Sequence, residues 1–273
     1  MTIDGLLQLH TLRAGAPGAV PLVLLHGFPL DHRMWFDVTP LLAGEPWVLA
    51  PDLPGFGTSP TGPDVAQTVG GSGPSIEVMA DGVAATLRAA GVDRAVVAGL
   101  SMGGYVAMAL VERHPELVAG LALLDTKATA DAEQARARRL EIAGTVEIED
   151  TIEAVLGMRS ALLAPAHRTG RPDLVERLEA WIRDQGPDGV AWAQRAMAAR
   201  PDRSAVLAAF DGPSVVVVGE FDELSPPEVA REMVGLLSDA ELVVVPAAGH
   251  MTTIENPEPV AAALTGLLGR VRD

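Results

Sequence analysis

Ser101 lies between two glycines in the segment Gly99–Gly103, which reads Gly-Leu-Ser-Met-Gly. A serine hydroxyl becomes a nucleophile where a base removes its proton and a sharp turn presents it to a substrate. The apolar run before this segment predicts a strand, and the apolar residues after it predict a helix. A strained turn leaves no room for a side chain on either flank, and glycine meets that requirement. The stretch therefore predicts a nucleophile elbow; the alternative is a Gly-rich turn with an idle serine.

Two further side chains could supply the base and the acid that a serine nucleophile needs. His250 follows the last predicted strand, and Asp222 follows the strand before it. The chain order of serine, aspartate and histidine fits a Ser-His-Asp site at the carboxyl edge of a parallel sheet. Asp125, at the end of the strand after the elbow helix, is an alternative acid. We expect His26, also at a strand end, to be a structural histidine.

Backbone N–H groups are expected to complete the site. Gly27 lets the chain approach a ligand closely, so the Phe28 amide is one candidate oxyanion donor. The Met102 amide, at the start of the helix after Ser101, is the second. This chemistry needs no cofactor, and we assign no metal site. The chain has no cysteine, which excludes disulfides, thiolate ligands and a Cys nucleophile.

The elements that position these residues alternate along the chain. An opening strand or hairpin is predicted near 6–12. Apolar runs then predict strands at 21–25, 47–50, 95–98, 120–124, 214–219 and 242–246. Helical patterns fall between them, at 35–42, 76–90, from Ser101 to about 114, and at 257–268. Residues 59–74 are rich in Gly, Pro, Thr and Ser and predict a mobile surface loop. Asp52, in a turn-rich segment, is expected to be structural. The alternation predicts an α/β fold with a doubly wound, mostly parallel sheet.

The pattern changes after the strand that ends at Asp125, where amphipathic helices follow one another without a strand. They are expected at 131–144, 151–163, 173–185 and 189–199. We interpret residues 128–203 as an all-helical cap over the site, and residues 1–127 and 204–273 as the core domain. Four large cap side chains are expected to pack within the cap, with the substrate pocket as the alternative: Met158, Trp181, Trp192 and Met197.

Composition limits the partners of this 273-residue chain. Its formal net charge of −16 repels nucleic acid and anionic membrane surfaces. We find neither a signal-peptide pattern nor an apolar run long enough to span a membrane, so a cytoplasmic protein is expected. Lys127 is the only lysine, which we attribute to a composition that favours arginine. The sequence leaves monomer and homo-oligomer open.

These motifs resemble those of the α/β-hydrolases with a lid, and within that superfamily they are most similar to esterases grouped with the 3-oxoadipate enol-lactonases. The segments that carry the resemblance are 26–29, 52–57, 99–104, 219–222, 249–251 and 255–257. The resemblance implies an α/β-hydrolase fold and a small-molecule ester or lactone substrate. It implies Ser101 as nucleophile, His250 as base, Asp222 as the acid that orients it, and the amides of Phe28 and Met102 as oxyanion donors.

Other activities are compatible with the same residues. A cofactor-free haloperoxidase or perhydrolase, or a hydrolase of C–C bonds, would keep the nucleophile, the base and the acid. A ligand-binding protein that kept the fold and lost the chemistry is an alternative from another class. The cap decides what Ser101 acts upon, and it carries no motif for one substrate.

Overall fold

A seven-stranded sheet forms the centre of the computed structural model, which describes residues 5–16 and 18–271. The strands lie in the order β1-β3-β2-β4-β5-β6-β7 and have the bounds β1 Leu9–Arg13, β2 Leu22–Leu25, β3 Val48–Pro51, β4 Ala95–Leu100, β5 Val118–Leu124, β6 Ser214–Gly219 and β7 Ala240–Val245. Strand β1 pairs with β3 in antiparallel orientation, and the other pairs are parallel. The mostly parallel sheet expected from the sequence is confirmed. Its inner strands are apolar throughout because both of their faces are buried.

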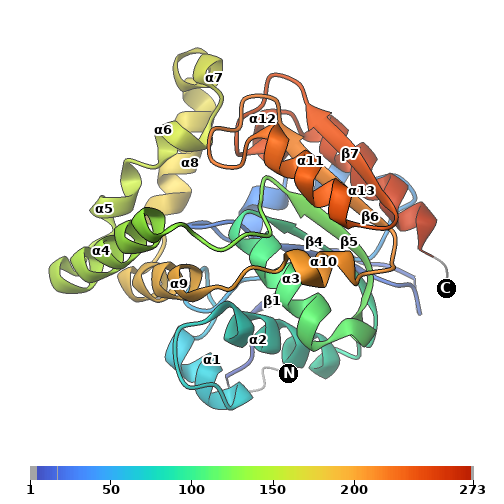
Figure 1. Cartoon of the computed structure of the whole chain (residues 1–273), viewed down its shortest axis with the longest axis horizontal. Helices are drawn as coiled ribbons and strands as arrows, with labels where there is room; N and C mark the ends of the chain where they lie inside the picture. The colour runs from blue at the N-terminus through green and yellow to red at the C-terminus, as the bar shows by residue number, and fades with distance from the viewer. Residues whose placement is uncertain (1–4, 17, 272–273) are drawn as a thin grey trace.

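Helices cover both faces of this sheet (Figure 1). On one face, neighbouring helices pack in a row: α2 Ile76–Ala89, α3 Met102–Arg113, α10 Ser204–Ala208 and α11 Pro227–Leu236. On the other face, α13 Pro257–Arg270 packs against the sheet and against the 3-10 turn η2 Thr39–Leu41. The doubly wound arrangement is thereby confirmed. Within the described ranges, no helix has the length and apolar character to cross a membrane.

Short elements complete this framework. They are the 3-10 turns η1 His32–Trp35 and η3 Pro115–Leu117 and the helix α12 Thr252–Glu255. Two 3-10 turns, η1 and η2, take the place of the single helix predicted over 35–42. Helix α2 follows its prediction because the Ser75 side chain accepts a hydrogen bond from the Val78 N–H and so caps the first turn. Its apolar residues, spaced three or four apart, are buried against the core.

Helices connect β5 to β6, and those that precede α10 gather on one side of the sheet, at the left of Figure 1. They are α4 Glu133–Glu149, α5 Glu153–Leu156, α6 Arg159–Leu162, α7 Pro165–Gly170, α8 Pro172–Arg183 and α9 Pro187–Ala199. The single helix predicted over 151–163 is wrong. Gly157, a poor helix former, separates α5 from α6, and each piece packs on α8 by itself. The division into cap and core at 128 and 204 stays a prediction.

Residues 59–74 do not form the continuous surface loop that their composition predicts. Helix α1, Gly62–Val69, occupies the middle of the segment. The Thr61 side chain accepts a hydrogen bond from the Asp64 N–H at the start of the helix, and Gly70 ends it in the left-handed conformation at φ 74°. The same Gly, Pro and Thr residues that indicate a loop are thus the ones that begin and end a short helix.

Glycines allow helix α3 to approach the sheet closely at its first turn. A Cβ atom added to Gly103 would lie 2.2 Å from the carbonyl oxygen of Leu25, at the end of β2. A Cβ atom on Gly99 would lie 2.2 Å from the Gly103 carbonyl oxygen. Both contacts are with backbone, which cannot turn aside as a long side chain can. Glycine at these two positions is therefore a packing requirement of the strand-turn-helix junction.

We expect Gly103→Ala to lower the free energy of unfolding by about 1–3 kcal/mol, because the new methyl group overlaps backbone. Gly144→Ala is the matched control, since Gly144 lies within α4 and its added Cβ meets nothing within 4 Å. The control should raise stability by about 0.5–1 kcal/mol, because alanine favours the helix. Urea unfolding followed by circular dichroism measures both variants. An unchanged Gly103→Ala protein would contradict the packing argument.

Candidate active site

Ser101 sits at the junction of β4 and α3 in a backbone conformation that is unfavourable for a residue with a side chain, with φ 53° and ψ −110°. Neighbouring groups hold it there. The Ser101 N–H donates a hydrogen bond to the Leu124 carbonyl at 2.9 Å, and the Thr126 hydroxyl donates to the Ser101 carbonyl at 2.8 Å. The sharp turn expected from the glycine pattern is present, and it directs the hydroxyl away from the sheet.

The structure brings Ser101, His250 and Asp222 together in one hydrogen-bonded chain. His250 Nε2 lies 2.9 Å from Ser101 Oγ, and His250 Nδ1 lies 2.9 Å from the nearer oxygen of Asp222. Both the imidazole and the carboxylate are buried. The N–H groups of Leu224 and Ser225 donate to Asp222 Oδ1, which fixes the carboxylate in the loop after β6. This arrangement lets the imidazole exchange a proton with the hydroxyl while the carboxylate fixes its tautomer.

Asp125, the alternative acid, is buried but faces other partners. One of its oxygens accepts a hydrogen bond from the Gly219 N–H at 2.9 Å, and the other accepts from the Thr252 hydroxyl. Burial, together with the nearby charge of Asp222, raises the pKa of Asp125 well above its usual range. The structure thus places Asp222 against the histidine and directs Asp125 to the end of β6 and the start of α12.

The loop of residues 26–29 lies against the serine. A Cβ atom added to Gly27 would come within 3.6 Å of Ser101 Cβ, so the backbone that leads to Phe28 passes beside the hydroxyl. The Met102 N–H is the first of helix α3 and finds no acceptor inside the helix. His26 is buried and bonded to backbone on both nitrogens: Nδ1 lies 3.0 Å from the Gly27 carbonyl, and Nε2 accepts from the Leu53 N–H. Burial lowers the pKa of His26, which keeps the ring neutral.

Glu255 begins the segment 255–257, and the structure places its carboxylate beside the loop that carries His250. Its Oε1 atom accepts hydrogen bonds from the N–H groups of Gly249 and Met251, the two neighbours of the histidine. Its Oε2 atom accepts from the Ala164 N–H and lies 2.7 Å from Nδ1 of His167. One buried carboxylate therefore ties the histidine loop to the helical segment. The spacing of five residues after His250 is the only sequence signal for it.

A cavity of about 230 Å³ opens at Ser101 and His250 between the sheet edge and the helical segment. Its other lining residues include Phe28, Tyr105, Lys127, Asp131, Arg139, Met158, Leu162, Met197 and Leu224. Met158 and Met197 thus face the cavity, although the sequence favoured packing within the cap. Lys127, attributed to composition alone, stands in the same wall.

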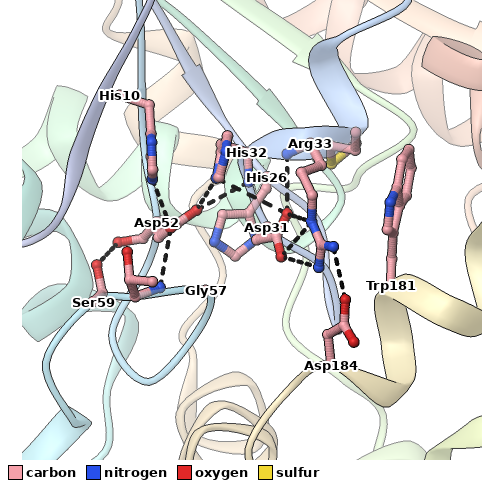
Figure 2. A network of polar contacts seen from close by, with 12 residues as sticks. His10, His26, Asp31, His32, Arg33, Asp52, Gly57, Ser59, Trp181 and Asp184 are labelled. Atoms are coloured by element: carbon pink, nitrogen blue, oxygen red, sulfur yellow. Dashed lines mark hydrogen bonds and ion pairs between the residues drawn. The ribbon is translucent and has the colours of Figure 1, made fainter.

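A second polar cluster surrounds Asp52, as Figure 2 shows. Among the described residues, His10, His32 and Asp52 form the group whose donor atoms lie close enough together to hold a metal ion. His10 Nε2 lies 2.9 Å from one carboxylate oxygen, His32 Nδ1 lies 2.8 Å from the other, and the two rings stack at 3.5 Å. Because hydrogen bonds already engage both oxygens, we interpret the cluster as structural. Burial opposes ionisation of Asp52, but the hydrogen bonds from His32 and His10 hold its pKa well below its usual range.

The same figure shows how this region reaches the helical segment. The buried Asp31 carboxylate accepts hydrogen bonds from Arg33, which also pairs with Asp184 just after α8 at 2.7 Å. The side chain of Gln185 donates to Asp31 and accepts from the Gly57 N–H. The η1 turn after the Phe28 loop and the segment after β3 are therefore both fixed to the turn between α8 and α9.

A family model described as the alpha/beta hydrolase fold matches residues 20–257. The chain belongs to this family. The predicted fold class and superfamily are thereby confirmed. Among solved structures, a malate-bound thermophilic esterase from Thermogutta terrifontis is 35% identical, with a TM-score of 0.88 over 98% of this chain and 95% of that one.

Further relatives within the hydrolase fold have diverse names. The 2-succinyl-6-hydroxy-2,4-cyclohexadiene-1-carboxylate synthase of Enterobacter sp. is 32% identical over 96% of both chains. A component of the acetoin cleaving system of Pseudomonas putida, a dihydrolipoyllysine-residue acetyltransferase, is 30% identical over 95% of this chain, which spans 66% of that longer protein. The enol-lactonase of Burkholderia xenovorans, at 22% identity and a TM-score of 0.80 over 96% of both chains, shares the fold.

We expect Asp222→Asn to lower the turnover of an activated test ester by about 10³–10⁴-fold, because the amide can stabilise the wrong imidazole tautomer. Asp125→Asn is the matched comparison and should stay within about tenfold of wild type, since a neutral side chain suits its buried place. Steady-state kinetics on one activated ester measures both variants, with circular dichroism as a check of folding. A larger loss in Asp125→Asn would make that residue the acid.

We expect Asp52→Asn to lower the free energy of unfolding by about 1.5–3 kcal/mol at pH 7, because it removes a charged acceptor. The lowered pKa means that the ionised carboxylate stabilises the fold above the ordinary value of 3.8, and that this contribution is lost as the pH falls through the folded-state value. The difference in the free energy of unfolding between the wild type and the variant should therefore become smaller below about pH 4. Urea titrations at several pH values measure it. Asp184→Asn, at the exposed end of the network in Figure 2, should cost less than about 1 kcal/mol at every pH.

Proposed function

We propose that the protein is a serine hydrolase that cleaves a carboxylic ester or lactone of a small molecule through an acyl-enzyme intermediate. The observation that carries the proposal is the hydrogen-bonded chain from Ser101 through His250 to Asp222 at the edge of a cavity. Serine, imidazole and carboxylate in that order are what acyl transfer to a hydroxyl requires. The likeness to a solved esterase at 35% identity supports this choice.

In the proposed first half-reaction, Ser101 Oγ attacks the carbonyl carbon while His250 Nε2 takes the hydroxyl proton. The carbonyl oxygen becomes an oxyanion, for which the amides of Phe28 and Met102 are the proposed donors. Each such donor contributes about 3 kcal/mol to the stability of the transition state. The C–O bond of the ester then breaks, and His250 gives its proton to the leaving alkoxide. Asp222 stabilises the imidazolium that exists between these steps.

In the proposed second half-reaction, a water molecule attacks the acyl carbon as His250 takes its proton. The bond to Ser101 breaks, the serine oxygen regains that proton, and the carboxylic acid leaves. With a lactone the alkoxide stays attached to the acyl group, so the product is a hydroxy acid. The chemistry requires neither a metal nor an organic cofactor. A cytoplasmic enzyme with a small-molecule substrate is the setting that we propose for it.

The size of the cavity favours short substrates. A volume of about 230 Å³ holds on the order of eight groups of the size of a water molecule. Apolar side chains from Phe28, Met158 and Leu162 line part of it and provide a surface for a short acyl chain. We therefore include acetyl and butyryl esters as the first substrates of the proposed enzyme.

We expect turnover of p-nitrophenyl acetate and butyrate by the wild type and a loss of at least ~10³-fold in kcat for Ser101→Ala. Absorbance of the released nitrophenolate measures both rates. A fluorophosphonate probe should label the wild type on Ser101 and leave Ser101→Ala unlabelled. Ser225→Ala is the control, because this serine lines the same cavity and should not affect labelling. Equal rates for wild type and Ser101→Ala would overturn the proposal.

A further inference from the structure

One wall of the cavity at Ser101 carries a cluster of charged side chains around the Asp131 carboxylate. Lys127 Nζ lies 3.2 Å from Asp131 Oδ1, and Arg139 Nε lies 2.6 Å from Oδ2. Arg200 donates to both oxygens from behind the wall, at 2.7 and 2.8 Å, and its guanidinium stacks 4.1 Å from the centre of the Tyr105 ring. These residues come from the loop after β5 and from helix α4 and the end of α9, so the helical segment builds this side of the site.

The cluster is positively charged in an otherwise acidic chain. Burial opposes ionisation of Asp131, but the hydrogen bonds and charges of Arg200 and Arg139 hold its pKa well below its usual range, so it is an anion. One carboxylate compensates one of the three cations, and two positive charges stay uncompensated by it. The chain as a whole has a formal net charge of −16. A local excess of cations therefore requires a reason beyond composition.

The two cations that line the cavity keep donors available, whereas the third does not. The side chains of Lys127 and Arg139 are 25% and 22% exposed, against 2% for Arg200. Arg139 uses Nε for Asp131 and Nη1 for Gln194 and Met197, and its Nη2 donates to no acceptor in the part of the chain that the structure describes. The Lys127 ammonium has three N–H groups and pairs with Asp131 alone within that part. Asp131 thus orients both cations and leaves N–H donors of each available to a ligand.

We propose that Lys127 and Arg139 bind a carboxylate of the substrate. The Lys127 ammonium and the free Nη2 of Arg139 can each donate to one oxygen of a carboxylate, and such charge-assisted hydrogen bonds are stronger than those between neutral groups. Because Ser101 lines the same cavity of about 230 Å³, the ester and the carboxylate belong to one short molecule. The substrate class is therefore the half-ester of a short dicarboxylic acid. This inference rests on the proposed ester hydrolysis.

Two esters of nearly equal size test it. Monomethyl succinate and methyl butyrate differ only where a carboxylate replaces a terminal methyl group, and methanol release measures the hydrolysis of both. The wild type should show a kcat/KM for monomethyl succinate at least about tenfold above that for methyl butyrate. Lys127→Met and Arg139→Met should each remove about tenfold of this preference through KM. Circular dichroism checks that both variants fold, and the ratio of kcat/KM for the two esters measures the preference that each variant loses.

Arg195→Met is the matched control, because Arg195 pairs with Glu147 and does not line the catalytic cavity. This variant should leave kcat/KM for both esters unchanged. A wild type that prefers methyl butyrate, or cavity variants that weaken both esters equally, would overturn the carboxylate site while leaving ester hydrolysis intact. If the wild type hydrolyses neither ester, the proposed function fails. Calorimetric titration with succinate then decides the carboxylate site by itself: binding that Arg139→Met weakens supports it, and no binding overturns it.

Discussion

Helix α3 begins so close to β2 that only the hydrogen of a glycine fits between Gly103 and the Leu25 carbonyl. This contact fixes where the first turn of the helix lies, and with it the strained backbone of Ser101. The loop that carries Phe28 follows directly from β2, so the same contact sets its distance from the serine hydroxyl. A Cβ atom at this point would displace the hydroxyl and the nearest candidate oxyanion amide together. The geometry of the candidate site thus depends on close packing of the backbone as well as on its side chains.

The core of the site could be predicted because strands of a parallel sheet end at one edge. Apolar runs mark the strands in the sequence, and Ser101, Asp222 and His250 each follow one of them. The choice between Asp222 and Asp125 could not be made in this way, since both follow strands. It depends on which carboxylate turns toward the imidazole, and that follows from the Gly219 N–H, which holds Asp125 aside.

The helical segment could be predicted as helices but not as a wall of the cavity. Amphipathic periodicity indicates a buried face without naming what covers it. Lys127 and Asp131 come from a stretch without regular structure, and their partner Arg139 lies on α4, so no spacing in the sequence relates them to Ser101. Helix α1 was not predicted for a different reason, because its capping residues are also typical loop residues. Sequence reasoning therefore missed contacts between residues far apart in the chain, and it missed a helix whose capping residues also occur in loops.

The carboxylate of Glu255 joins the loop that carries His250 to the helical segment. It accepts from both neighbours of His250, and it also accepts from Ala164 in the helical segment. The helical segment is therefore not an interchangeable module that can be grafted from one relative to another without regard to the core. A transplanted segment must present an N–H group at the place of Ala164, or leave a buried carboxylate oxygen with fewer partners beside the histidine. In this chain, the Glu255 side chain contributes both to the position of the helical segment over the cavity and to the alignment of His250.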